Sequence, residues 1–145
     1  MDQAELKQKV VDFLNVHRKA VVAIVGEGGV PSTSLMLYVI DEHLNVYFGT
    51  RKSFGKYKAL LNDPNVSLTV VEETLDPLRA VEIRGVVEFI PEDKTGETLK
   101  FFESKNKSKY YVKGAEDFVM FKVVPNFVRY LDATSGELVL DHINF

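Results

Sequence analysis

A short basic segment, residues 49–58, contains the residue types that are best suited to chemistry. It reads Gly-Thr-Arg-Lys-Ser-Phe-Gly-Lys-Tyr-Lys, and the seven residues 50–56 within it gather two hydroxyls and three cations, namely Thr50, Ser53, Arg51, Lys52 and Lys56. We expect it to leave a strand and enter a helix, with Ser53 as the N-cap. Cations at a helix N-terminus are locally unfavourable, and a bound anion would reverse that repulsion. The segment is therefore either an anion site or a set of solvated lysines beside a serine cap.

The elements expected around this segment are mostly strands. Leu6, Val10, Phe13 and Leu14 recur at helical spacing, which predicts an amphipathic helix over residues 3–18. Apolar runs bounded by turn residues predict the strands, and Gly85 inside one of them predicts a bulge or bend. The strands are expected at residues 20–25, 32–40, 46–49, 66–71, 81–90, 118–124, 127–131 and 138–140. Two further helices are expected at residues 53–62 and 92–103.

The fold class follows from the links between these strands. Most links are too short for parallel crossovers, so we expect mainly antiparallel pairing. This number of strands, with two or three helices against them, favours a mainly β structure that forms a closed or nearly closed barrel. No repeat or linker divides the sequence, so residues 1–145 are expected to form a single domain.

Composition narrows the function classes. The chain has 145 residues, a net charge of −3 and no cysteine, and its pI is about 5.6. A duplex-binding domain is more often strongly basic, so we expect no nucleic-acid partner. No apolar run approaches a membrane span, and the absence of cysteine favours the cytoplasm. His17, His43 and His142 lack ligand spacing, so no metal site is expected.

The order of residues around the basic segment resembles that of the pyridoxamine 5′-phosphate oxidase-like family of FMN-binding split barrels. The matching features are Tyr-Phe-Gly-Thr ending at Thr50, a lysine six residues later at Lys56, and Asn-Asp-Pro-Asn-Val-Ser-Leu over residues 62–68. The resemblance implies an antiparallel split β-barrel that binds FMN. It places the ribityl phosphate near Thr50, Ser53 and Lys56, where either Arg51 or Lys52 would supply further charge. The flavin would lie along Ser34, Leu35, Met36 and Leu37, and Arg79 would contribute from a later strand.

The resemblance also implies a homodimer with its cofactor at the interface. The apolar residues of the run 118–131 would independently supply dimer surface, unless both faces of these strands are buried within one chain. Where the namesake oxidase has an arginine and a serine before its phosphate lysine, this sequence has Gly55 and Phe54. The C-terminal signature with which the namesake oxidase helps to bind its substrate is absent from this sequence. The resemblance therefore does not imply oxidation of a vitamin phosphate.

Three functions remain open at the level of sequence. The first is an FMN-dependent oxidoreductase with a small-molecule substrate that the sequence does not identify, in which the flavin supplies the chemistry. The second is a non-catalytic flavin-binding stress-response protein. The third is a relative that binds a deazaflavin or haem, in which the basic run 105–109 would meet an anionic tail or His142 would bind iron. No general acid or base can be named, and Tyr38, Tyr110, Tyr111 and His142 are the available groups.

Overall fold

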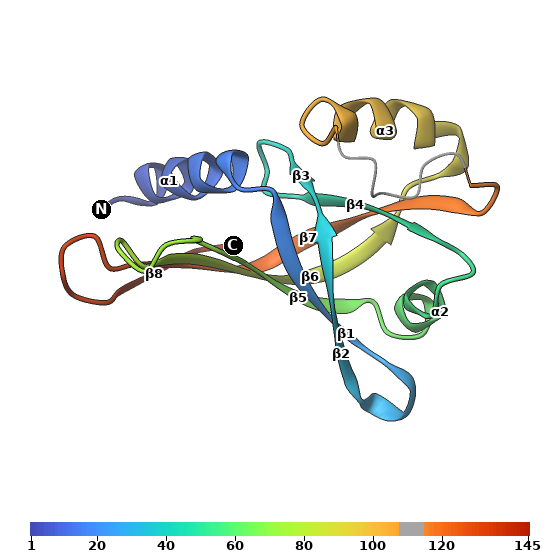
Figure 1. Cartoon of the computed structure of the whole chain (residues 1–145), viewed down its shortest axis with the longest axis horizontal. Helices are drawn as coiled ribbons and strands as arrows, with labels where there is room; N and C mark the ends of the chain where they lie inside the picture. Colours follow the sequence, from blue (N-terminus) through green and yellow to red (C-terminus); the bar gives the residue numbers. More distant parts are fainter. Residues whose placement is uncertain (108–114) are drawn as a thin grey trace.

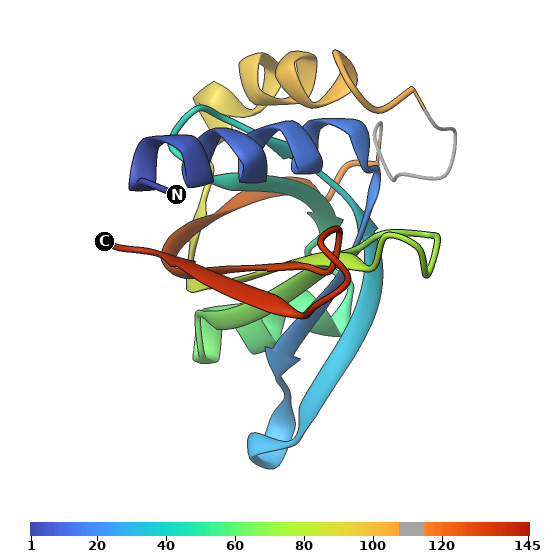
Figure 2. The same cartoon turned by 90° about the vertical axis from the view of Figure 1, so that its left-hand side faces the viewer.

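The structure is a computed structural model that describes residues 1–107 and 115–145. Eight strands form one antiparallel sheet in the order β2-β1-β5-β6-β7-β4-β3, and β8 pairs with β7. The sheet curls into a half-barrel, with helices outside it (Figures 1 and 2). The expected mainly β, antiparallel split barrel with flanking helices is confirmed. Its strands are β1 (Lys19–Val25), β2 (Pro31–Leu37), β3 (Val39–Ile40), β4 (Val46–Arg51), β5 (Asn65–Val71), β6 (Arg79–Phe89), β7 (Phe118–Asp132) and β8 (Val139–Ile143).

Three α-helices flank the sheet: α1 (Gln3–Val16), α2 (Gly55–Asn62) and α3 (Thr95–Glu103). The side chain of Asp2 caps α1 by accepting a hydrogen bond from the backbone N–H of Glu5 at 2.8 Å. The face of α1 that the sequence predicted is buried in the barrel core, through Leu6, Val10, Phe13 and Leu14. Helix α1 ends two residues earlier than expected, because His17 takes an extended backbone conformation and its ring bonds the carbonyl of Phe13.

The run expected as one strand over residues 32–40 is broken at Tyr38. Its side chain is fully buried, and its hydroxyl donates to the carbonyl of Leu14 at 2.7 Å. Strand β2 pairs with β1 before this residue, and β3 pairs with β4 after it. The chain therefore changes partners at Tyr38. Before that point β1 and β2 form a hairpin that projects from the body of the molecule (Figure 1).

Strand β7 is continuous where two strands were expected. Its register against β6 shifts between Arg84 and Gly85, with Arg84 opposite Phe127 and Gly85 opposite Pro125. Asn126 is thus the extra residue of a β-bulge. A Cβ on Gly85 would lie 2.2 Å from the carbonyl oxygen of Val124, so only glycine permits this approach. The expected bulge or bend at Gly85 is confirmed, and it keeps residues 125 and 126 inside one strand.

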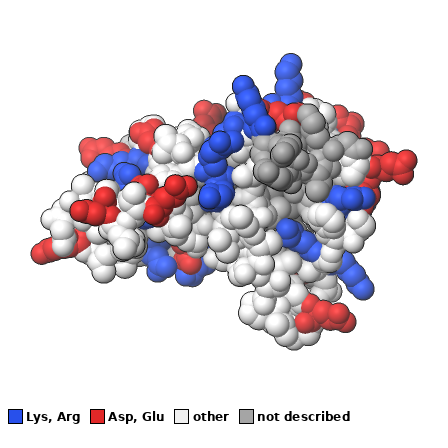
Figure 3. Space-filling view, viewed as in Figure 1, with Lys and Arg blue, Asp and Glu red and all other residues white. Residues whose placement is uncertain are grey.

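Many of the apolar side chains of β7 are buried within the chain. Val119, Phe121, Val123, Val128 and Tyr130 are each at most 9% exposed. The face that carries these side chains is therefore covered inside the monomer and is not available to a partner. Phe118, Val124 and Phe127 are only half-buried, so a contribution of this strand to a dimer stays a prediction. On the face seen in Figure 3, acidic and basic side chains are interspersed.

Candidate functional site

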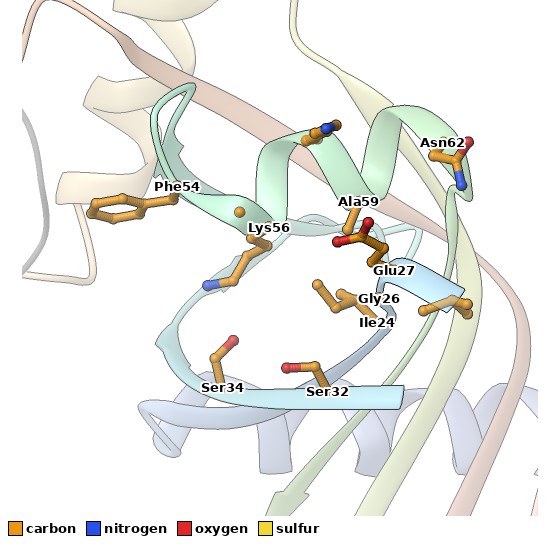
Figure 4. Close-up of a pocket in the computed structure, with 12 residues that line it drawn as sticks. Ile24, Gly26, Glu27, Ser32, Ser34, Phe54, Lys56, Ala59 and Asn62 are labelled. Atoms are coloured by element: carbon orange, nitrogen blue, oxygen red, sulfur yellow. The ribbon is translucent and has the colours of Figure 1, made fainter. Parts of the chain in front are cut away.

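A groove of about 670 Å³ lies between helix α2 and the β1–β2 hairpin. Its size is within the range of ligand pockets, which run from roughly 300 to 1,000 Å³. Figure 4 shows Lys56 reaching from the start of α2 toward β2, whose Ser32 and Ser34 point back toward the helix. The groove is lined by Ile24, Val25, Gly26, Glu27, Ser32, Ser34, Phe54, Gly55, Lys56, Lys58, Ala59 and Asn62.

Lys56 is the cation at the centre of this groove. Its Nζ lies 3.5 Å from the sulfur of Met36, which is a weak acceptor. In the part of the chain that the structure describes, no carboxylate forms an ion pair with Lys56. Burial lowers the pKa of its ammonium group below the usual lysine value. A half-buried cation without a counter-ion is a strong attractor for an anionic ligand.

Helix α2 begins at Gly55, and its N-cap is Phe54, so the expected capping role of Ser53 is wrong. Phe54 offers no side-chain acceptor, and the first turn contains no acidic residue. The backbone N–H groups of Gly55 and Lys56 are therefore donors at a helix start that no capping side chain satisfies. They add to the positive potential around Lys56. Ser53 lies one residue further out because its backbone N–H is bound by a carboxylate, that of Asp117.

The residues expected on the flavin strand divide between two faces of β2. Ser34 lies opposite Val22 and Met36 opposite Ala20, on the side that faces α2 and the core. Leu35 lies on the opposite face and is 66% exposed. Leu37 shares that face and lines a separate cavity. Among the described strands β2 pairs with β1 alone, and the backbone groups along its other edge carry no strand partner from that part of the chain.

Thr50 and Arg51 approach the groove from strand β4 without lining it. Thr50 is 2% exposed, and its Oγ1 finds no hydrogen-bond partner among the described residues. A buried hydroxyl without a partner is uncommon and requires an explanation such as a ligand or water. The Nε of Arg51 donates to Oδ1 of Asp117 at 2.8 Å, and its guanidinium lies 5.6 Å from the centre of the Phe54 ring. Arg51 is therefore already engaged by neighbours.

Arg79 belongs to a different cluster. Its guanidinium donates to Glu72, and the other oxygen of Glu72 lies 3.2 Å from Nε2 of His17. These three residues line a second cavity of about 670 Å³, which also includes Leu37. Within one chain the structure brings Ser34 and Lys56 together, and it places Arg79 at another site.

Sequence reasoning missed most of the residues that line the groove. Those with polar side chains are Glu27, Ser32, Lys58 and Asn62, and Asp117 in the approach to the groove was missed as well. Ser32 could have been found from the two-residue period of a strand, because it shares a face with Ser34. Asp117 carried no local signal, since it lies 64 residues from its partner Ser53. Of the basic run 105–109, Ser108 and Lys109 lie outside the described residues, as do Tyr110 and Tyr111.

Comparison with known proteins decides the family. A family model described as pyridoxamine 5′-phosphate oxidase matches residues 6–132. The chain belongs to the pyridoxamine 5′-phosphate oxidase-like family. The matched region includes both walls of the groove and all the residues expected to contact the cofactor. A search of curated proteins finds no significant match.

Solved structures share the fold of this family member. A putative pyridoxamine 5′-phosphate oxidase from Listeria innocua is 22% identical over 86% of this chain and 97% of its own, with a TM-score of 0.72. General Stress Protein 26 from Bacillus anthracis is 18% identical over 97% and 99%, with a TM-score of 0.75. A heme binding protein from Mycobacterium smegmatis is 17% identical over 97% and 58%, with a TM-score of 0.75. A protein described as an F420 reductase is 23% identical over 81% and 93%, with a TM-score of 0.68.

Two further features concern the described residues alone. No helix among them has both the length and the apolar character that crossing a bilayer requires. Nor do they contain a group of three or more His, Cys, Asp or Glu side chains that could hold a metal ion.

Proposed function

We propose that this chain binds FMN, with the phosphate at the start of α2 and Lys56 as its main cationic ligand. The observation that carries the proposal is the half-buried ammonium group of Lys56, which has no carboxylate partner in the described chain and faces Ser34 across the groove. A phosphate would supply the missing negative charge and accept charge-assisted hydrogen bonds. Uncapped N–H groups of Gly55 and Lys56 favour the same ligand.

The chemistry of the groove fits the whole cofactor as well as its phosphate. Ile24, Val25 and Ala59 contribute apolar walls, while Ser32 and Ser34 contribute hydroxyls. Such a mixture of apolar surface and few polar groups is typical of cofactor sites. In this proposal Met36 packs beside the cofactor, and Leu35 and Leu37 contribute backbone groups of the open edge of β2. Thr50 and Ser53 contribute to the polar surroundings of the phosphate.

We propose that the FMN-bound protein is an oxidoreductase that acts on a small-molecule substrate. We also propose that it works in the cytoplasm. A bound flavin would supply the electron transfer, and the chain would supply binding, orientation and electrostatics. Among the described residues that line the groove there is no histidine, and Glu27 is the one carboxylate. Similarity in fold to General Stress Protein 26 favours a second candidate, a flavin-binding stress-response protein without turnover.

The cofactor could differ within the same fold, as the names of two structural neighbours indicate. A haem would need an axial ligand. His142, which lies on β8, packs its ring 5.4 Å from the ring of Phe127 on β7 and does not line the groove. A deazaflavin with a long anionic tail would need cations beyond the phosphate site. Lys105 points elsewhere, because its Nζ donates to the carbonyl of Leu14. These contacts favour FMN over both alternatives.

We also propose a homodimer whose interface lies on the outer face of β1, β2 and β5. Val21 and Leu35 are paired across β1 and β2 and are 47% and 66% exposed, and Val71 on β5 is 57% exposed. Contiguous exposed apolar surface often marks an interaction site. Arg79 lies near this side of the molecule, lining a cavity with Leu37. In a dimer it would reach a cofactor from a position that a single chain does not provide.

The test is the absorption spectrum of the purified protein, followed by titration of the cofactor-free protein with FMN, F420 and haem. We expect the two flavin bands, quenching of FMN fluorescence on binding, and co-elution of FMN with a dimer in size-exclusion chromatography. Colourless protein that leaves FMN fluorescence unchanged would refute the proposal. Preferential binding of F420 or haem would keep the fold assignment and replace the cofactor.

A further inference from the structure

Asp117 holds three consecutive residues, from the last residue of β4 into the loop before α2, through its carboxylate and its backbone carbonyl. Its Oδ1 accepts from Nε of Arg51 at 2.8 Å, and its Oδ2 accepts from the backbone N–H of Ser53 at 3.0 Å. Its backbone carbonyl accepts from the N–H of Lys52 at 2.9 Å. Asp117 immediately precedes β7, whose first residue pairs with Arg51. Asp117, from a distant part of the sequence, thus ties the end of β4 and the following loop to the start of β7.

This attachment sets the point at which α2 begins. Arg51 and Ser53 are fixed by Asp117, and the N–H of Phe54 donates to the carbonyl of Arg51 at 3.0 Å. No side chain caps the helix itself. In most helices a capping side chain accepts from the first N–H groups and would occupy the position of a bound anion. Here the loop is ordered from outside, and none of the described residues accepts a hydrogen bond from the N–H groups of Gly55 and Lys56.

The charge of Asp117 is balanced locally. Hydrogen bonds from Ser53 and Arg51 hold the pKa of its carboxyl well below the usual range, so it is ionised at neutral pH. Arg51 supplies the opposite charge. Its guanidinium in turn lies over the ring of Phe54, the N-cap residue that lines one end of the groove. The pair therefore orders the loop without adding net charge beside the groove.

We propose that Asp117 is the positioning residue of the phosphate site, which acts by holding residues 51–53 so that the start of α2 and Lys56 face the groove. The inference rests on the proposed binding of FMN. It assigns Asp117 a role that its charge alone would contradict, because a lone carboxylate near a phosphate weakens binding. Neutralising the carboxylate should therefore weaken FMN binding if Asp117 positions the site, and strengthen it if the charge of Asp117 acts on the phosphate alone.

The experiment compares the dissociation constants of FMN and riboflavin, which differ only in the phosphate. Asp117→Asn keeps the shape of the side chain and offers one acceptor oxygen for two donors. Asp117→Glu keeps the charge and displaces it by one methylene. Both variants should lower the preference for FMN over riboflavin about tenfold, as expected for the loss of a charge-assisted contact, with riboflavin affinity unchanged. Glu116→Gln, which removes a neighbouring charge, is the matched control and should change the preference less than twofold.

The outcomes separate the two proposals. If the unmodified protein binds FMN no better than riboflavin, the proposed phosphate site is wrong. If it prefers FMN and Asp117→Asn keeps or raises that preference, the positioning role alone is refuted. A thermal melt of each variant checks the fold, and Asp117→Glu decides the matter if Asp117→Asn is unfolded. In a Lys56→Met background the effect of Asp117→Asn should largely disappear, because both changes act on one contact.

Discussion

Replacement of Lys56 by methionine separates the binding role of this residue from its cost to the fold. Methionine keeps the length of the side chain and its apolar stem, and it removes only the ammonium group. That group is half-buried, contacts the sulfur of Met36 at 3.5 Å and has no carboxylate partner in the described chain. Its loss removes one charge-assisted bond to the phosphate, worth about 1.5–3 kcal/mol. FMN should therefore bind roughly ten- to a hundredfold more weakly.

The stability of the cofactor-free protein should change in the opposite direction. Burial lowers the pKa of Lys56, which means that the fold disfavours the charged form relative to the unfolded chain. At neutral pH the unmodified protein carries that cost, and Lys56→Met removes it. The melting temperature without cofactor should therefore rise. Such a combination of weaker binding and higher stability is characteristic of a residue that is retained for its ligand.

The assay is a fluorescence titration with FMN and with riboflavin, together with thermal melts of both cofactor-free proteins. Lys52→Met is the matched control, because Lys52 is an exposed cation in the adjacent loop that does not line the groove. It should change FMN affinity less than threefold. An equal loss of riboflavin and FMN affinity in Lys56→Met would refute the assignment of Lys56 to the phosphate.

The remaining predictions concern the barrel and the proposed interface. Gly85→Ala should destabilise the protein by about 2–4 kcal/mol in urea denaturation, because its Cβ would meet the Val124 carbonyl, whereas Gly96→Ala, in open space within α3, should stabilise it by about 0.5–1 kcal/mol. Burial and the charge of a nearby arginine lower the pKa of Lys105 to about 8, so stability should rise with pH from about 8 to 10 and Lys105→Met should lose that rise, as followed by denaturation midpoints. Leu35→Glu should convert the proposed dimer to monomer in sedimentation analysis, and a dimer that persists would place the interface elsewhere.

Much of the barrel could be predicted from sequence because its signals are local. The apolar face of α1, the alternation within the strands and the glycine of the bulge each depend on neighbouring residues. Errors arose where a distant contact decides the local conformation. Tyr38 breaks a strand because its hydroxyl bonds Leu14, and α2 starts late because Asp117 holds Ser53.

The candidate site shows the same division. Lys56 and Ser34 were predicted and lie together in the groove. The two-residue period of β2 already separates Leu35 and Leu37 from them, so their different face was accessible to sequence reasoning. Arg51 was expected to face the phosphate, and its pairing with Asp117 depends on a contact across 66 residues. No pattern within the segment could have indicated that partner.

The break at Tyr38 gives the groove one fixed end and one compliant end. Tyr38 is held by the carbonyl of Leu14, by Lys105 over its ring at 3.8 Å and by Asn106 bound to its carbonyl. Strand β1 pairs with β5 from Val21 to Ile24. Beyond Ile24 the tip of the hairpin, with its turn at residues 27–29, projects from the sheet (Figure 1). We therefore expect the wall near Ser34 and Lys56 to be held more firmly than the wall near Glu27. If a ligand is held by its phosphate near Lys56, the groove near Glu27 could widen or narrow to fit the size of the rest of the ligand.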